Sequence, residues 1–224
     1  MLLRDRVYQS IRRAILTCEL QPGQELREQI LAERYRVSRS PIRDSLLRLE
    51  QENLVTVLPR QGYRVNPISI PDVEDIFDLR LLIEPACVAA AARADDTAQQ
   101  TLDQFRGFAD SEQTESEFFE YNRSFHRAVI GLSANARMVA IGLELDEQFQ
   151  RLMLISLRAL SDESVRQAAR EHEAIIDAIQ ARDAERAARL SCEHSARAHA
   201  RILTSVRLVA QQWDASAEAP ASHG

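Results

Sequence analysis

Apolar residues near the N-terminus recur at helical spacing in three consecutive segments. The first segment ends where Pro22 and Gly23 interrupt the helical period. Only residues 35–37 separate the second segment from the third, and two helices joined by so short a turn form a helix-turn-helix. The helices expected from this pattern cover residues 4–18, 27–34 and 38–52.

A different pattern follows the third expected helix. Residues 54–58 and 63–65 are β-prone and flank a turn at 59–62 that contains Pro and Gly. Two such runs around a turn predict a hairpin. A hairpin after a helix-turn-helix acts as its wing, so we expect a winged helix-turn-helix over residues 1–66.

The chain changes character between residues 67 and 71. Pro67 and Pro71 fall in this stretch, which has no helical period and which we interpret as a linker. Ser69 precedes Asp72 by three residues. This spacing is typical of the N-terminal cap of a helix, so a helical segment is expected to begin here.

Residues 72–213 show long helical patterns and almost no strand signal. Alanine is abundant there, while glycine and proline are scarce. The sequence therefore predicts a mainly α protein, in which the winged helix-turn-helix precedes an all-α bundle. Residues 214–224 are small and polar, and we expect a disordered tail there. The helices expected in the bundle cover 72–94, 97–111, 115–133, 136–158, 162–181 and 183–212.

Charge is divided unevenly between the two parts. Residues 1–66 carry 12 Arg against 8 acidic residues, a balance of +4, whereas residues 67–224 carry 16 Arg against 26 acidic residues, a balance of -10. The net charge of -6 therefore conceals a basic head on an acidic body. This asymmetry favours a nucleic-acid-binding module joined to a module of another kind.

Composition narrows the class of protein. An apolar fraction of 45% and a charged fraction of 28% are typical of a globular protein. We find no apolar run of membrane-spanning length and no signal peptide, so we expect a cytoplasmic protein without membrane contact. Cys18, Cys87 and Cys192 are far apart and lack CxxC spacing. They predict neither a disulfide framework nor a zinc ribbon, and we interpret all three as small buried apolar residues.

Four polar residues cluster at the start of the third expected helix. Ser38 or Ser40 can cap this helix, whose free N–H groups and positive dipole end would then face a phosphate. Arg39 and Arg43 are four residues apart and therefore share one helix face. Arginines at this end of a recognition helix can reach guanine O6 and N7 in the major groove. The alternative for each is a phosphate contact or a solvated side chain.

Residues 31–50, LAERYRVSRSPIRDSLLRLE, resemble the GntR family of bacterial regulators, and residues 60–65, RQGYRV, resemble the wing of that family. The resemblance covers the whole head in order and spacing. It implies sequence-specific binding to double-stranded DNA. It also implies that the wing tip approaches the minor groove through Arg60, Gln61 and Gly62.

The turn between the two helices departs from this family. Where the family usually carries Leu-Gly, this sequence has Tyr35 and Arg36. A non-Gly residue in a left-handed turn costs roughly 1 kcal/mol. Either the turn differs, or Arg36 offsets the cost through a phosphate contact. Arg34, Arg36 and Arg48 are otherwise interpreted as sequence-blind phosphate contacts or solvated charges.

Three of the five histidines lie on apolar faces of expected helices, and these are His126, His172 and His194. A single buried imidazole is usually a hydrogen-bonded core residue. Three that point into one interior would be satisfied together by a divalent metal ion. The alternative is a hydrogen-bonded polar pocket without metal. His199 lies off the main stripe and His223 lies in the tail, and both are interpreted as incidental.

The order of these residues resembles the FCD domain, the helical ligand-binding domain of FadR-type GntR regulators. Its metal-binding members use an Asp and a His four residues apart, followed by two later histidines. The corresponding residues here are Asn122, His126, His172 and His194. The resemblance implies a site for a divalent ion such as zinc or nickel. Asn in place of the family's Asp removes one negative charge and leaves a carbonyl oxygen as the available ligand.

Arg80 is the candidate residue for binding an effector. It borders an apolar stripe and has Glu84 one turn further on. Beside the metal, Arg80 would bind the carboxylate of an organic acid. The alternative is an ion pair with Glu84 on the helix surface, worth about a few tenths of a kcal/mol.

Together these features predict a homodimeric transcriptional regulator, and not an enzyme, that binds a palindromic operator. A small organic acid in the helical domain would change the arrangement of the two heads, with a typical coupling of about 1 to 3 kcal/mol. One alternative is a DNA-binding protein whose bundle only dimerises. Another is a metallohydrolase, for which no carboxylate is placed as general base and the head would have no role.

Overall fold

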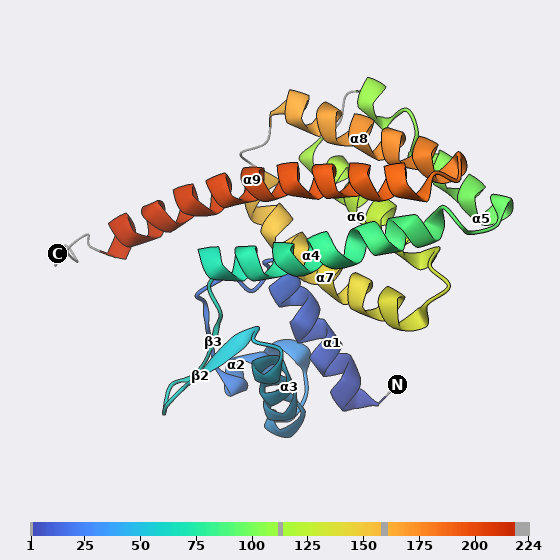
Figure 1. The fold of residues 1–224 in the computed structure, drawn as a ribbon. Coiled ribbons are helices and arrows are strands. Elements are labelled where there is room, and N and C mark those ends of the chain that lie inside the picture. The colour runs from blue at the N-terminus through green and yellow to red at the C-terminus, as the bar shows by residue number, and fades with distance from the viewer. Residues whose placement is uncertain (1, 112–113, 158–160, 218–224) are drawn as a thin grey trace. The chain divides into compact units, whose positions relative to one another are not determined.

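The computed structural model describes residues 2–111, 114–157 and 161–217, with the side chains of the last helix described as far as Leu208. The chain divides between Ile68 and Ser69 into two compact units. The first unit is a winged helix-turn-helix and the second is built of helices (Figure 1). The predicted fold class is therefore confirmed.

The first unit is formed by α1 (Leu3–Leu16), β1 (Glu25–Leu26), α2 (Glu28–Tyr35), α3 (Arg39–Gln51), β2 (Val55–Leu58) and β3 (Gly62–Val65). The helices α2 and α3 form the helix-turn-helix, and α1 packs against α3. The strands β2 and β3 form the antiparallel hairpin of the wing. The pattern did not predict β1, which pairs with the other edge of β3, because two residues are too few to show an alternation.

The core of the first unit joins its helices to its sheet. Ile15 of α1, Leu46 of α3 and Val65 of β3 are fully buried in one cluster. Gly62 begins β3 with a φ of 115°, and a Cβ at this position would lie 2.5 Å from the carbonyl oxygen of Leu26. The wing therefore approaches β1 more closely than a side chain at residue 62 would allow.

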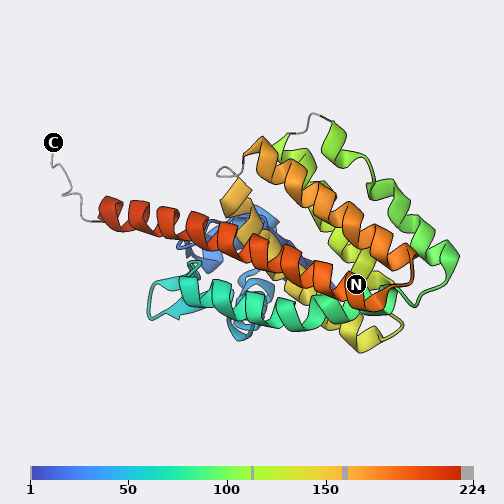
Figure 2. The ribbon, with the colours of Figure 1, turned by 45° about the horizontal axis from the view of Figure 1, so that its top comes forward.

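The second unit is formed by α4 (Ile70–Ala91), α5 (Asp96–Gln100), the 3-10 helices η1 (Thr101–Phe105) and η2 (Phe108–Asp110), α6 (Glu115–Gly131), α7 (Ala136–Leu157), α8 (Asp162–Gln180) and α9 (Ala184–Ala217). The helices α4 and α9 lie side by side, as both ribbon views show (Figure 1 and Figure 2). Residues of α4, η1, α6 and α8 share one buried cluster. This bundle positions the side chains of the candidate metal site.

The helix expected over 97–111 is not continuous, and this prediction was wrong. The chain instead forms α5, η1 and η2, with Gly107 in a left-handed conformation at a φ of 76° before η2. A right-handed helix cannot continue through that conformation. Leu102 and Phe105 are nevertheless buried, so the short turns bury the same kind of apolar face that suggested one helix.

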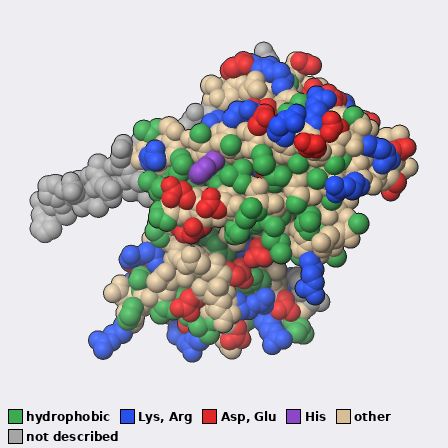
Figure 3. All heavy atoms as spheres, viewed as in Figure 1, with side chains coloured by type: hydrophobic (Ala, Val, Ile, Leu, Met, Phe, Trp, Pro, Cys, Tyr) green, Lys and Arg blue, Asp and Glu red, His purple; other side chains and the backbone are tan. Residues whose placement is uncertain are grey.

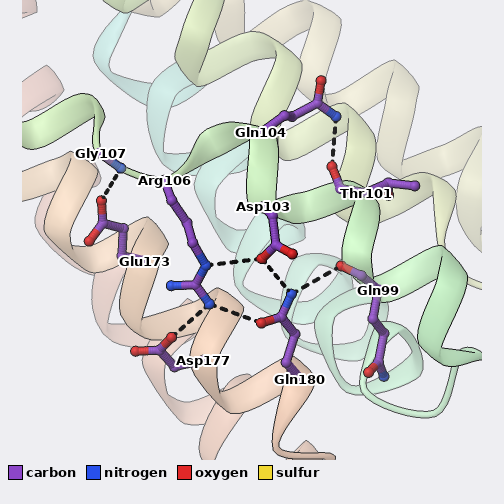
Figure 4. Close-up of polar contacts among 9 residues, drawn as sticks. All are labelled: Gln99, Thr101, Asp103, Gln104, Arg106, Gly107, Glu173, Asp177 and Gln180. Carbon is purple, nitrogen blue, oxygen red and sulfur yellow. Dashed lines mark hydrogen bonds and ion pairs between the residues drawn. The ribbon is translucent and has the colours of Figure 1, made fainter.

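A polar network ties this broken segment to α8 (Figure 4). The Arg106 guanidinium donates to Asp103 at 3.1 Å and to Asp177 of α8 at 2.8 Å. Gln180 of α8 donates to Asp103 at 2.9 Å. These side chains hold the segment against α8 although it has few regular helical hydrogen bonds of its own.

Both ends of the helical unit extend beyond their expected limits. The predicted cap of α4 is confirmed, because the Ser69 hydroxyl accepts from the Asp72 N–H at 3.2 Å and the Asp72 carboxylate accepts from the Ser69 N–H at 3.1 Å. The helix begins at Ile70, so the last two residues of the expected linker, 67–71, are helical. Of the expected tail, 214–224, the first four residues belong to α9, and the rest lies outside the described residues.

The cysteines differ in burial. Cys87 is fully buried as expected, and burial raises the pKa of its thiol to about 11. Cys18 and Cys192 are only half-buried, so their interpretation as buried residues was wrong. Cys18 follows the end of α1, where the turning chain leaves one side of the residue open.

A membrane span would need a helix of sufficient length and apolarity, and the described residues contain none.

Candidate functional site

The turn of the helix-turn-helix contains a left-handed residue although no glycine is present. Arg36 has a φ of 55° and a ψ of 47°. Its N–H donates to the Glu33 carbonyl at 3.2 Å, and the Val37 N–H donates to the Ala32 carbonyl at 3.0 Å. This is the Schellman pattern of helix ends. The turn is therefore not altered to avoid the strain of a left-handed arginine, which is roughly 1 kcal/mol.

The two arginines expected to read bases project from the N-terminal part of α3. The Arg39 guanidinium donates to the Gln29 amide oxygen at 3.0 Å. The Arg43 guanidinium makes two hydrogen bonds of 3.0 Å to the Glu28 carboxylate, and 62% of its side chain is exposed. Both partners belong to α2. The two arginines are thus held by exposed contacts with α2.

Ser38 occupies the N-cap position of α3, but its side chain makes no capping hydrogen bond. The expectation that Ser38 or Ser40 caps α3 is confirmed in that Ser38 is the N-cap residue. It was wrong in that no capping hydrogen bond from the Ser38 side chain is found among the described residues. Ser40 lies inside the first turn of the helix, and both serines are exposed. The hydroxyl groups and the first N–H groups of α3 consequently face solvent together.

The wing tip and the remaining arginines also lie on the surface. Arg60 has a left-handed φ of 66°, and the Gln61 N–H donates to the Leu58 carbonyl at 3.0 Å, which closes the turn. Arg34 pairs with Glu19 at 3.3 Å. Every residue expected at the DNA is exposed except Gly62, which is half-buried.

In the second unit, three helices bring three imidazoles together. His126 comes from α6, His172 from α8 and His194 from α9, and none is more than 7% exposed. One nitrogen of each ring lies within 4.8 Å of the other two. The prediction that these histidines point into one interior is confirmed. We call this group the histidine centre.

Two of the rings are oriented by polar partners on their outer side. The Nδ1 atom of His194 lies 2.7 Å from the Glu171 carboxylate, and that of His172 lies 3.3 Å from the Tyr121 hydroxyl. A carboxylate only accepts, so Nδ1 of His194 carries the proton and Nε2 keeps its lone pair in the neutral ring. The Nε2 atoms of His172 and His194 are 3.2 Å apart, while Nε2 of His126 is buried without a partner. Three Nε2 atoms therefore face the interior.

Burial favours the neutral form of two of the rings, those of His126 and His172. Burial lowers the pKa of His126 to about 3, against the opposing charge of Glu84 at 3.7 Å. It also lowers the pKa of His172 well below its usual value. Burial alone would raise the pKa of Glu171, but the hydrogen bond with His194 and other partners lower it overall. Neutral imidazoles beside an ionised carboxylate are the form that binds a metal ion.

The donor set of the histidine centre fits a divalent ion. Two nitrogens bound to one zinc ion at about 2.0–2.1 Å are themselves about 3 to 3.5 Å apart. The 3.2 Å separation of the His172 and His194 nitrogens falls in that range. Outer hydrogen bonds like those from Glu171 and Tyr121 orient ligating histidines. Asn122 lies one helical turn before His126 and is 5% exposed, so it lies on the same buried side of α6.

Arg80 and Glu84 form a buried ion pair. Arg80 is 1% exposed, and its Nη2 lies 2.5 Å from the Glu84 carboxylate, which also accepts from the Ser195 hydroxyl at 2.7 Å. The guanidinium lies 3.4 Å from the ring centroid of Phe149. An ion pair between Arg80 and Glu84 on the helix surface was the alternative interpretation. The pairing is confirmed, but the surface location was wrong, because the pair lies in the core. Among the described residues, the Nε and Nη1 atoms of Arg80 have no hydrogen-bond partner.

A small pocket opens between α6, α7, α8 and α9. It adjoins the histidine centre, because Asn122 and His194 are part of its wall. Arg80 does not line it. The polar residues of the wall are Asn122, Ser156, Ser164, His194 and Arg201.

Sequence reasoning missed the residues that support the histidines and the cavity. Glu171 and Tyr121 become partners only through tertiary packing. Arg201 could have been found, because it continues the face of His194 seven residues further along α9. His199 is not incidental, since it stacks on Phe77 with ring centroids 4.5 Å apart. His223 lies outside the described residues.

Comparison with known proteins assigns both parts of the chain. Residues 3–65 match the family described as bacterial regulatory proteins, gntR family, and residues 75–197 match the FCD domain. The chain is 28% identical over 214 residues to the HTH-type transcriptional repressor GlaR of Escherichia coli (strain K12), with 91% of this chain and 94% of GlaR covered. It is 28% identical over 216 residues to the HTH-type transcriptional repressor RspR of the same strain, with 94% of this chain and 91% of RspR covered.

Solved structures show the same fold. E. coli McbR/YncC matches with a TM-score of 0.73 at 20% identity, over 95% of this chain and 99% of that chain. A putative transcriptional regulator GntR from Rhodococcus sp. RHA1 matches with a TM-score of 0.68 at 21% identity, over 90% and 97% of the two chains. Because the FCD match alone spans more than half of the chain and the GntR match spans its head, the chain belongs to the GntR family of DNA-binding transcriptional regulators with an FCD domain, and it is not an enzyme.

Proposed function

We propose that the chain recognises a palindromic DNA operator through α3 and the wing. The observation that carries this proposal is the exposure of Arg39 and Arg43 at the start of α3, where their guanidinium groups contact Gln29 and Glu28. In this proposal the two arginines bind guanine edges in the major groove. The remaining contacts to phosphates and to the minor groove come from Ser38, Ser40, Arg34, Arg36, Arg60, Gln61 and Gly62.

A second copy of the chain would complete the operator contact. One head covers a half-site, and an inverted repeat requires two heads related by a two-fold axis. Leu79 and Leu82 of α4 are 51% and 71% exposed, and hydrophobic side chains gather over this helix in Figure 3. An apolar patch of this kind supports a homodimer formed through the helical domain.

In the helical domain, Asn122, His126, His172 and His194 would hold a zinc or nickel ion. The lowered pKa values of His126 and His172, the 3.2 Å contact between Nε2 of His172 and Nε2 of His194, and the buried Nε2 of His126, which has no hydrogen-bond partner among the described residues, support this assignment. The ion would supply an electrophilic site for an anionic oxygen.

The expected effector is a small organic acid, and the pocket that adjoins the histidine centre supports it. Arg80, the carboxylate partner expected from the sequence, offers two donors without acceptors, but they lie in the core. The effector changes operator affinity only if it binds one arrangement of the two heads better than the other. A bundle that only dimerises would show no such change.

Selection of bound sequences from a random DNA pool tests the proposal. Wild-type protein should enrich a short inverted repeat at a stated salt concentration. The double variant Arg39→Ala/Arg43→Ala should not, whereas Arg137→Ala, which removes an exposed charge from the helical domain, should behave as wild type. Enrichment of the same repeat by the double variant would refute the assignment of α3 as the base-reading helix.

A further inference from the structure

We propose that Leu47 of α3 reads a thymine base of the operator by contacting its C5-methyl group. This inference rests on the proposed function and deepens it, because it adds an apolar base contact to those of the arginines. Leu47 lies four residues after Arg43, so the two side chains leave α3 on the same side. An exposed apolar group therefore follows an exposed guanidinium by one helical turn.

The head is packed without help from Leu47. Ile42, Leu46 and Leu49 of α3 are fully buried in the core of the first unit. The Leu47 residue is instead 44% exposed, and in α3, all of which the structure describes, it is the one large hydrophobic residue that is exposed. Single apolar residues are common on protein surfaces, so exposure alone assigns no role to Leu47. Its position on the helix does.

Leu47 lies in the middle of the exposed face of α3. Ser40 and Asp44 precede it by seven and three residues, and Gln51 follows it by four. All three are exposed, as is Arg43. Residues at these spacings share one side of a helix. Leu47 therefore interrupts a polar face with an apolar side chain, and this is the face proposed to enter the major groove.

The chemistry of a leucine side chain selects thymine among the four bases. Leucine can neither donate nor accept a hydrogen bond, and in the major groove the C5-methyl of thymine is the apolar group that a base presents. Arg43 and Leu47 are about 6 Å apart along α3 at 1.5 Å per residue, and successive bases are about 3.4 Å apart. The thymine is therefore expected about two base pairs from the guanine that Arg43 binds.

Replacing single thymines of the selected operator by uracil tests this contact, because uracil lacks only the C5-methyl group. In fluorescence anisotropy with wild type, uracil at one position of each half-site should weaken binding about 3- to 10-fold. Leu47→Ala should bind the thymine operator more weakly by a similar factor and should not distinguish thymine from uracil at that position. Leu47→Gln, which keeps the length of the side chain, should also lose the distinction.

The matched control is Leu3→Ala, which removes a leucine that is 57% exposed on α1. This variant should bind both operators as wild type does. The comparison separates the loss of a base contact from the general loss of an exposed leucine.

Three results would overturn the role of Leu47. They are the absence of a uracil effect at every thymine of the half-site, an undiminished uracil effect in Leu47→Ala, and an operator without thymine near the guanine of Arg43. In each case, loss of binding by Arg39→Ala/Arg43→Ala would leave the proposed function in place. If wild-type protein selects no repeat, the proposed function fails, and the role of Leu47 fails with it.

Discussion

Two Arg–Glu ion pairs of the same composition lie in opposite environments. Arg43 and Glu28 pair at 3.0 Å with 62% and 21% of their side chains exposed, whereas the side chains of Arg80 and Glu84 are 1% and 6% exposed. Water and salt screen the exposed pair, so it contributes little to stability and can be broken at little cost. The buried pair cannot be exchanged without leaving a charge in the core. The Arg43–Glu28 pair thus remains accessible, and the Arg80–Glu84 pair is part of the core.

Breaking the buried pair should have the largest effect. Arg80→Met leaves the Glu84 carboxylate buried without its main counterion, and we expect the free energy of unfolding to fall by about 3–5 kcal/mol. Urea unfolding followed by circular dichroism measures the change. The double variant Arg80→Met/Glu84→Gln should recover much of the loss because neither charge of the pair remains. If Arg80→Met were as stable as wild type, the buried pair would contribute no more to stability than the exposed pair does.

Metal binding should stabilise the helical domain by a smaller amount. A divalent ion that binds the native state stabilises it by about 2.7 kcal/mol at 100 times its dissociation constant. Thermal unfolding with zinc or nickel, against the same protein with a chelator, should show this shift in wild type and not in His172→Ala.

A control separates this effect from general loss of a histidine. His199→Gln removes a ring that stacks on Phe77 outside the histidine centre, so its metal-dependent shift should persist. Asn122→Asp should bind the ion more tightly, because it restores a negative charge. A full shift in His172→Ala would count against the site.

Removing either exposed arginine should weaken DNA binding without altering stability. Arg39→Ala or Arg43→Ala should cost roughly 1 to 3 kcal/mol on the selected operator and relax the base preference at one position of each half-site. Fluorescence anisotropy with operators substituted one base pair at a time measures both. An equal loss on all sequences would instead indicate a phosphate contact.

The smallest effect belongs to the acidic partner of Arg43. Glu28→Gln frees the guanidinium and removes a charge that repels phosphate, so operator affinity should rise by about 1 kcal/mol or less. Glu50→Gln makes the same change in net charge at an exposed residue of α3 and serves as the control. Weaker operator binding by Glu28→Gln would mean that Glu28 positions Arg43 for DNA rather than competing with it.

Features encoded in local sequence were predicted well. The helix-turn-helix, the hairpin and the Ser69 cap follow from periodicity, turn residues and the spacing to Asp72. The convergence of three histidines also followed, because each lies on the apolar face of its own helix.

Features that depend on packing were not predictable in the same way. The two-residue strand β1 exists only through its pairing with β3. The depth of the Arg80–Glu84 pair depends on Phe149 and Ser195, which belong to other helices. Glu171 is adjacent to His172 in sequence, yet it contacts His194. No local sequence pattern indicates this contact.

Most of α9 lies beyond the histidine centre. The helix has 34 residues, and about 35 Å of it extends beyond His194 at about 1.5 Å per residue. Near its beginning, α9 is joined to α4 by the hydrogen bond from Ser195 to Glu84. It is joined to α8 by the contact between His194 and Glu171. A tilt of about 5° at these contacts would move the far end by roughly 3 Å. If α9 turned as a rigid rod, a small displacement at the histidine centre would become a larger one at the far end of the helix.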